Sequence, residues 1–169
     1  MIKELPRYLI LFVVLVALQL LVLNNINLGG YINPYIYLLF ILLLPFSIPG
    51  WLLLAIGFLT GFTVDYFMGT LGLHASATLV LAFFRPTVLS RLSYRNDIDK
   101  FDSPDIVGSG MEWFVRYVII MVAIHHLALF GLEVFSFYHF YLTLLRVLLS
   151  TLFSSFFIII FELLYSRRK

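Results

Sequence analysis

The chain has 169 residues, of which 62% are hydrophobic and only 12% are charged, and its net charge is +2. Soluble domains carry about a quarter charged residues, so this composition, with a mean hydropathy of +1.04, indicates an integral membrane protein. The small net charge argues against a nucleic-acid partner, and the absence of cysteine excludes disulfides, thiolate chemistry and cysteine-ligated metals.

The apolar runs predict one all-α membrane domain that comprises the whole chain. A bilayer-crossing helix needs about 20 apolar residues, and we expect six transmembrane helices, at residues 8–23, 31–46, 51–66, 71–84, 113–135 and 138–165. The first run is interpreted as a retained span, because Asn24 and Asn25 follow it where a signal peptide would have small residues. The second run is short and is bracketed by Pro34 and Pro45, so we expect it to be broken or tilted.

Residues 85–112 form the one long polar segment and contain nine of the twenty charged residues. Six spans with both termini in the cytoplasm place this segment and the basic residues at the two chain ends on the cytoplasmic side, as the positive-inside rule requires. The connections on the opposite side carry no Lys or Arg. We therefore expect residues 85–112 to be a cytoplasmic loop, either a charged connector or a surface that docks a partner.

Small residues mark one face of the third predicted span. Gly57, Gly61 and Asp65 are spaced by four, so they lie along one side of a helix. Small side chains allow another helix to approach closely in lipid, which makes this face a candidate for binding a partner helix. Asp65 is either a helix-end carboxylate in the headgroup region or a paired group at a contact.

A polar stripe marks the last predicted span. Its members recur at steps of three and four, which keeps them on one helix face: His139, Thr143, Arg146, Ser150 and Ser154. Arg146 is the only basic residue that the topology places away from the cytoplasmic side, where a charge is costly unless it is paired, snorkelled or hydrated. Two interpretations stay open. Arg146 forms an ion pair with Asp65 or Glu133 or snorkels outward, or it lines a polar pocket that also includes His74 and His139.

Adjacent histidines in the fifth span raise the question of a metal site. His125 and His126 match no HExxH-type pattern, and neither has an acidic residue three or four positions further along. His126 and Glu133 share a face, but we expect no metal and no cofactor here. The pair is interpreted as packed between helices.

Three motifs carry a resemblance to a known family: Gly57-xxx-Gly61-xxx-Asp65 leading into Leu71-Gly-Leu-His74, the run from Trp113-Phe-Val-Arg-Tyr117 to His125-His126, and Phe135-Ser-Phe. Together with the small size and six spans, they resemble the MreD family of bacterial rod shape-determining membrane proteins, of the Bacteroidetes type, over essentially the whole length. The resemblance implies a bacterial inner-membrane location. It also implies a fold similar to the substrate-binding S-components of energy-coupling-factor vitamin transporters.

The same resemblance implies a non-enzymatic role in the cell-elongation machinery that synthesises peptidoglycan. Its expected partners are the bitopic protein MreC, a RodA-type glycosyltransferase with its transpeptidase, and an MreB-like filament. A scaffold is therefore the leading hypothesis, and a homo-oligomer is compatible with it. The alternative is a solute-binding membrane subunit of a transporter. A lipid-modifying enzyme is a third hypothesis, but no nucleophile–base spacing, metal triad or DxxD cluster supports it.

Overall fold

A computed structural model of the chain describes residues 5–26, 32–92, 103–134 and 140–166. Five helices in these ranges are long and apolar enough to cross a membrane: α1 (Leu5–Leu21, extended to Asn25 by the 3-10 turn η2, Leu23–Asn25), α3 (Gly50–Met68), α4 (Leu73–Leu92), α6 (Met111–Val134) and α7 (Phe140–Ser166). The two remaining helices are short, α2 (Leu38–Leu42) and α5 (Ile106–Ser109). The described part of the chain contains no strand, which confirms the all-helical class, and its five long apolar helices are consistent with a multi-pass membrane protein.

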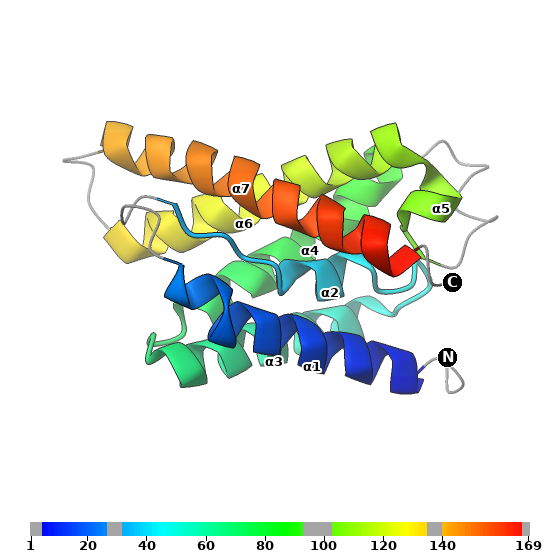
Figure 1. Cartoon of the computed structure of the whole chain (residues 1–169), viewed down its shortest axis with the longest axis horizontal. Helices are drawn as coiled ribbons and strands as arrows, with labels where there is room; N and C mark the ends of the chain where they lie inside the picture. Colours follow the sequence, from blue (N-terminus) through cyan, green and yellow to red (C-terminus); the bar gives the residue numbers. More distant parts are fainter. Residues whose placement is uncertain (1–4, 27–31, 93–102, 135–139, 167–169) are drawn as a thin grey trace.

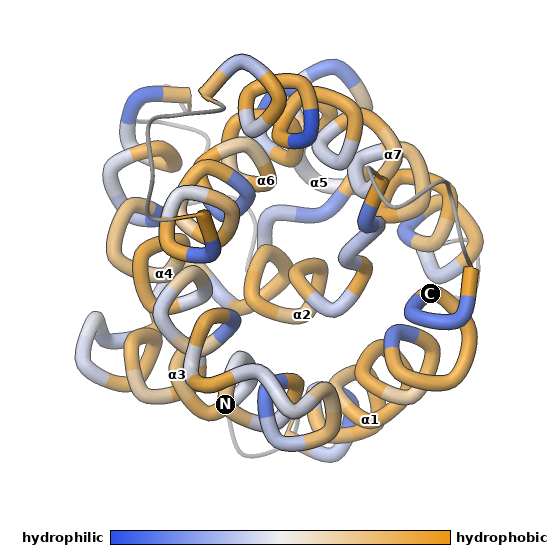
Figure 2. Tube along the Cα trace, turned by 90° about the vertical axis from the view of Figure 1, so that its left-hand side faces the viewer, coloured by the Kyte–Doolittle hydropathy of each residue, from blue (hydrophilic) through white to orange (hydrophobic). Residues whose placement is uncertain are grey.

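The long helices form a ring. Seen along the helix axes, α1, α3, α4, α6 and α7 surround α2 (Figure 2). Most residues of these helices are hydrophobic, as the orange colour in Figure 2 shows. Large apolar side chains point outward on several helices, for example Leu9, Phe83 and Leu148, each more than half exposed. Contiguous apolar surface of this kind marks contact with lipid or with other proteins. Both termini lie at one end of the bundle (Figure 1), which we call the terminal end.

The second predicted helix is the main departure from expectation. Instead of a helix over 31–46, the structure has only the short α2 within a segment that runs lengthwise through the ring (Figure 1). We call residues 32–49 the central segment; every residue from 35 to 44 in it is buried. Pro45 explains where α2 ends, because a proline lacks the backbone N–H and disfavours helical conformation in the residue before it. Six transmembrane helices are therefore not confirmed, because the described residues contain five of sufficient length, but the break expected in the second span is present.

The fourth helix is longer than predicted. We expected it to end at residue 84 and a cytoplasmic loop to occupy 85–112, but α4 continues through Pro86 to Leu92 and α6 begins at Met111. Pro86 removes one backbone hydrogen bond, which a helix packed among other helices in a membrane tolerates. At the terminal end the Trp113 Nε1–H donates to the Leu92 carbonyl at 3.1 Å and ties α6 to α4. The predicted loop is thus shorter by ten residues, eight of which belong to α4 and two to α6.

Candidate functional site

The non-helical part of the central segment cannot form the hydrogen bonds of a helix. In the interior of a membrane domain, such backbone groups must find partners within the protein. Gln19 of α1 supplies two of them. Its Oε1 accepts from the Ile36 backbone N–H at 2.8 Å, and its Nε2 donates to the Pro34 carbonyl at 3.1 Å. Gln19 is fully buried, and its Nε2 also donates to the Asn24 Oδ1 at 2.8 Å, so this amide joins the central segment to the end of the first helix.

Two serines of α7 supply further partners from the opposite side of the segment. The Ser150 hydroxyl oxygen accepts from the Asn33 backbone N–H at 3.1 Å, and that of Ser154 accepts from the Tyr35 N–H at 2.9 Å. Both serines are fully buried. The predicted polar stripe on this helix is therefore real, and its described serines bind the backbone of the same chain.

Arg85 of α4 binds the other end of the central segment. Its Nη2 donates to the Leu42 carbonyl at 3.3 Å and also to the Leu44 carbonyl, while its Nε donates to the Tyr117 hydroxyl at 3.0 Å. Tyr117 in turn donates to the Leu42 carbonyl at 3.2 Å. Arg85 is only 1% exposed. The last carbonyls of a helix lack intrahelical partners and carry partial negative charge, which attracts cations. The Arg85 guanidinium binds such carbonyls at the end of α2.

Arg85 was expected in a solvated loop, and that placement is wrong. A signal for the correct position exists in the sequence: Thr78, Leu81, Arg85 and Leu89 recur at steps of three and four, and all four are buried on one face of α4. The Arg85-Pro86 pair concealed this periodicity, because proline usually ends a helix.

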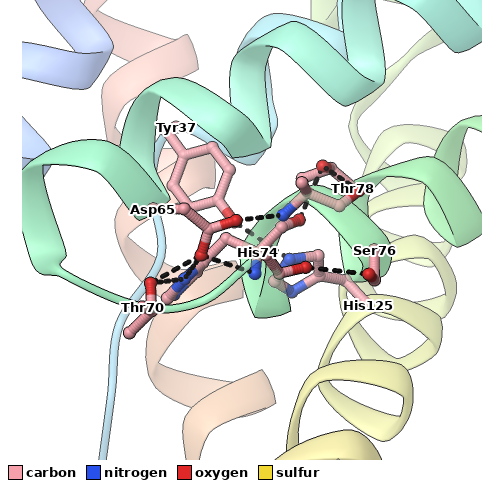
Figure 3. A network of polar contacts seen from close by, with 9 residues as sticks. Tyr37, Asp65, Thr70, His74, Ser76, Thr78 and His125 are labelled. Atoms are coloured by element: carbon pink, nitrogen blue, oxygen red, sulfur yellow. Dashed lines mark hydrogen bonds and ion pairs between the residues drawn. The ribbon is translucent and has the colours of Figure 1, made fainter.

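Asp65 connects the end of α3 to the start of α4 (Figure 3). Its Oδ1 accepts from the Thr70 hydroxyl at 2.5 Å and from the His74 backbone N–H at 3.0 Å, and its Oδ2 accepts from the Ala75 N–H at 2.8 Å. The His74 Nδ1 lies 3.1 Å from Oδ1. Free N–H groups at a helix N-terminus are the groups that a capping carboxylate satisfies. Asp65, only 4% exposed, therefore combines features of both expectations: it caps a helix end and is paired with His74 at the contact between α3 and α4.

Gly57 and Gly61 face α4 of the same chain. A methyl group at Gly57 would lie 2.9 Å from the Ala82 Cβ, and one at Gly61 would overlap Thr78 and lie 2.6 Å from the Ala75 Cα. The close helix approach predicted for this face thus occurs, but its partner is α4. The face has no room for a helix of another protein.

A cluster of aromatic and imidazole rings fills the space between the central segment, α4 and α6. Tyr35 lies with its ring centre 5.3 Å from that of His74, 5.9 Å from His125 and 5.5 Å from His126. The Tyr37 hydroxyl and the His125 Nε2 are 3.0 Å apart, and Figure 3 shows both beside His74. No group of three potential metal-ligating side chains was found among the described residues. The rings pack the core, as expected for the adjacent histidines.

His126 also contacts α7. Its Nδ1 lies 2.8 Å from the Val122 carbonyl of its own helix, and its Nε2 lies 3.4 Å from the Ser154 hydroxyl. Ser154 therefore links His126 to the backbone of Tyr35. This contact connects α6, α7 and the central segment through two buried side chains.

Arg146 is paired near the end of the bundle opposite the termini. Its Nη1 lies 2.9 Å from the Glu133 Oε2, and its guanidinium lies 4.2 Å from the centre of the Phe130 ring. The side-chain amide of Asn33 is oriented with its oxygen toward Arg146. This oxygen accepts from the Arg146 Nε at 3.3 Å and from Nη2 at 3.1 Å. Of the two acidic candidates, the pair uses Glu133 and leaves Asp65 to cap α4. His139, the remaining candidate, lies outside the described residues.

The two larger cavities lie away from Arg146. One, of about 560 Å³, opens between α1, the central segment and α3; the other, of about 580 Å³, is a groove along the α3–α4 turn that includes Asp65. A small cavity of about 70 Å³ lies beside Asn33 and Tyr35. Arg146, Ser150 and Ser154 contact the central segment instead of a sizeable cavity.

Comparison with known proteins yields no relative: no family model matches, and neither a curated protein nor a solved structure is similar at a significant level. The fold and its contacts define a class, an all-helical membrane protein with an internal non-helical segment. The interior of this protein is held together by polar side chains that bond its own backbone.

Proposed function

We propose that this protein is a non-enzymatic membrane scaffold of the MreD kind, acting in the cell-elongation machinery of a bacterium. One observation supports this function best: Gln19, Arg85, Ser150 and Ser154 are all buried and all bonded to the central segment. A transporter subunit or an enzyme needs polar groups directed at a substrate. Here these groups bind the chain's own backbone, so in this proposal the partners bind at the outer surfaces.

The surface that fits a partner helix best lies along the second half of α3, near the turn to α4. Phe58, Phe62 and Tyr66 line the groove of about 580 Å³ there and are 45%, 52% and 76% exposed. Aromatic side chains are enriched both at membrane interfaces and at protein–protein contacts. In this proposal the groove receives the transmembrane or juxtamembrane part of an MreC-like bitopic protein. The polar residues near the terminal end face a RodA-type synthase with its transpeptidase, and an MreB-like filament.

A photo-reactive amino acid at Phe62 or Tyr66 is expected to capture a bitopic membrane protein in native membranes, because both side chains project from the groove. The matched control is Leu148 on α7, which is 58% exposed and belongs to a different face of the ring. Mass spectrometry of the crosslinked products identifies the partner. Equal capture at Leu148 would argue against the groove. A vitamin or other solute that co-purifies in stoichiometric amount would favour the transporter-subunit alternative.

The orientation follows from the same proposal: both termini lie in the cytoplasm and the α3–α4 turn faces outward. Because the natural chain has no cysteine, single cysteines report topology without background. A cysteine at Leu71, which is fully exposed in this turn, is expected to react with a membrane-impermeant maleimide in intact spheroplasts. A cysteine at Ser103 is expected to react only after the membrane is opened. The reverse pattern would invert the topology.

A further inference from the structure

A cavity of about 560 Å³ lies at the terminal end, between the first half of α1, the end of the central segment and the start of α3. Apolar side chains such as Phe12, Phe40 and Leu52 make up most of its wall. Leu44 is the one residue of the network described above that also lines this cavity; Gln19, Arg85, Ser150 and Ser154 do not. A ligand in this cavity would be independent of the scaffold role proposed above.

The cavity exists because α1 packs closely only in its second half. The buried residues of α1 are Leu11, Leu15, Val16 and Gln19, so its first turns bury none. At Pro45 the chain turns away from the centre of the ring toward α3. The space beside the start of α1 is therefore unfilled. Two lining residues, Leu5 and Leu9, are more than half exposed, so the cavity reaches the apolar outer surface.

Arg7 is the one charged side chain among the described residues that line the cavity. Its Nε donates to the Tyr165 hydroxyl at 2.7 Å, and its guanidinium carbon lies 5.5 Å from the centre of the Tyr165 ring. These contacts hold the guanidinium between α1 and α7. A guanidinium presents its N–H groups as a planar fork that matches a phosphate group. The hydroxyls of Ser47 and Ser103 line the same cavity.

We propose that this cavity binds one acyl chain of an anionic membrane phospholipid, whose phosphate contacts Arg7. Transfer of the chain from bilayer hydrocarbon into an apolar cavity contributes little by itself, because lipid tails are as apolar as the lining. Selectivity for anionic lipid therefore comes from the guanidinium. The position of Arg7 on the first turn of α1, at the end of a membrane-crossing helix, suits the depth of a headgroup.

The test uses the full chain in detergent micelles, with dioleoyl phosphatidylglycerol or dioleoyl phosphatidylcholine added, and native mass spectrometry to count retained lipids. We expect one phosphatidylglycerol adduct on the wild type. Arg7→Gln should weaken this adduct about tenfold, the size of one charge-assisted contact, without changing phosphatidylcholine binding, and Arg7→Lys should restore part of it. Arg116→Gln removes an exposed positive charge on α6 near the same end and should have no effect. An equal loss in both glutamine variants would reduce the site to general surface attraction and overturn the proposal.

A second pair of variants tests the cavity itself. Leu52→Trp or Ile48→Trp fills it and should displace the phosphatidylglycerol, whereas Leu148→Trp on the outer face of α7 should not. Tyr165→Phe removes the hydroxyl that binds Arg7 and separates loss of the α1–α7 contact from loss of the phosphate contact; it should retain the lipid. Thermal unfolding identifies any variant that does not fold. A folded Leu52→Trp or Ile48→Trp variant that keeps the adduct would overturn the proposal, because no chain would then occupy the cavity.

Discussion

Replacing Gly61 with alanine is expected to lower the free energy of unfolding by about 3 kcal/mol, near the upper end of the usual cost of overpacking. The added methyl group would overlap the Thr78 hydroxyl and the His74 carbonyl, and would lie 2.6 Å from the Ala75 Cα. Two of these obstacles are backbone atoms of α4, so a side-chain rotation cannot relieve them. The helices must separate, which also strains the Asp65 cap at the end of the same helix pair.

The chain offers matched controls for this prediction. Gly131 of α6 has nothing within 4 Å of the position of a Cβ, so alanine there should be neutral or stabilising by about 0.5–1 kcal/mol through helix propensity. Gly57, where the nearest atom is the Ala82 Cβ at 2.9 Å, should give an intermediate loss. Thermal unfolding in one detergent ranks the three variants. A Gly61→Ala protein as stable as Gly131→Ala would show that the α3–α4 contact is looser than described.

Replacing Arg85 with methionine is expected to destabilise the protein by about 2–3 kcal/mol. Two effects oppose each other. Removing a buried charge recovers its desolvation cost, but it orphans the Leu44 carbonyl and leaves the Leu42 carbonyl with Tyr117 alone. No carboxylate lies within ion-pair distance of Arg85 among the residues described, so its donors serve two backbone carbonyls and the Tyr117 hydroxyl. An orphaned carbonyl costs about 1–3 kcal/mol, and a hydrogen bond from a charged donor contributes about 1.5–3 kcal/mol, so destabilisation prevails.

Tyr117→Phe is the companion variant, because it removes one hydroxyl and leaves Arg85 on both carbonyls. Its loss should be about 1 kcal/mol, and the double variant should depart from additivity because the two side chains share the Leu42 carbonyl. Chemical or thermal unfolding of the four proteins gives the coupling. An Arg85→Met protein with wild-type stability would mean that water reaches the end of α2.

The sequence predicted the class of fold and most of its long helices, because lipid-length apolar runs are a strong signal. It failed at residues 31–46. Hydropathy indicates burial, and residues 35–44 are buried, but burial does not distinguish a helix from an extended segment whose hydrogen bonds come from Gln19, Ser150 and Ser154. Such long-range bonds have no local signature in a single sequence.

The candidate site was likewise predicted only in part from the sequence. The spacing of Gly57 and Gly61 correctly predicted a close helix contact, yet periodicity cannot reveal whether the second helix belongs to the same chain. Charge alone marked Arg146 as paired or solvated, and Glu133 proved to be its partner. Arg85 was misplaced because the general rule for proline outweighed the buried periodicity of α4.

The central segment also has a consequence for biogenesis. Its backbone bonds to Ser150 and Ser154 join residues 117 and 119 positions apart in the chain, and both serines belong to α7, which is synthesised long after the central segment. Until α7 enters the membrane, the N–H groups of Asn33 and Tyr35 lack these partners, and hydrocarbon supplies no substitute. The hydrogen bonds of the central segment are therefore completed only after α7 is in place, although the segment itself emerges from the ribosome early.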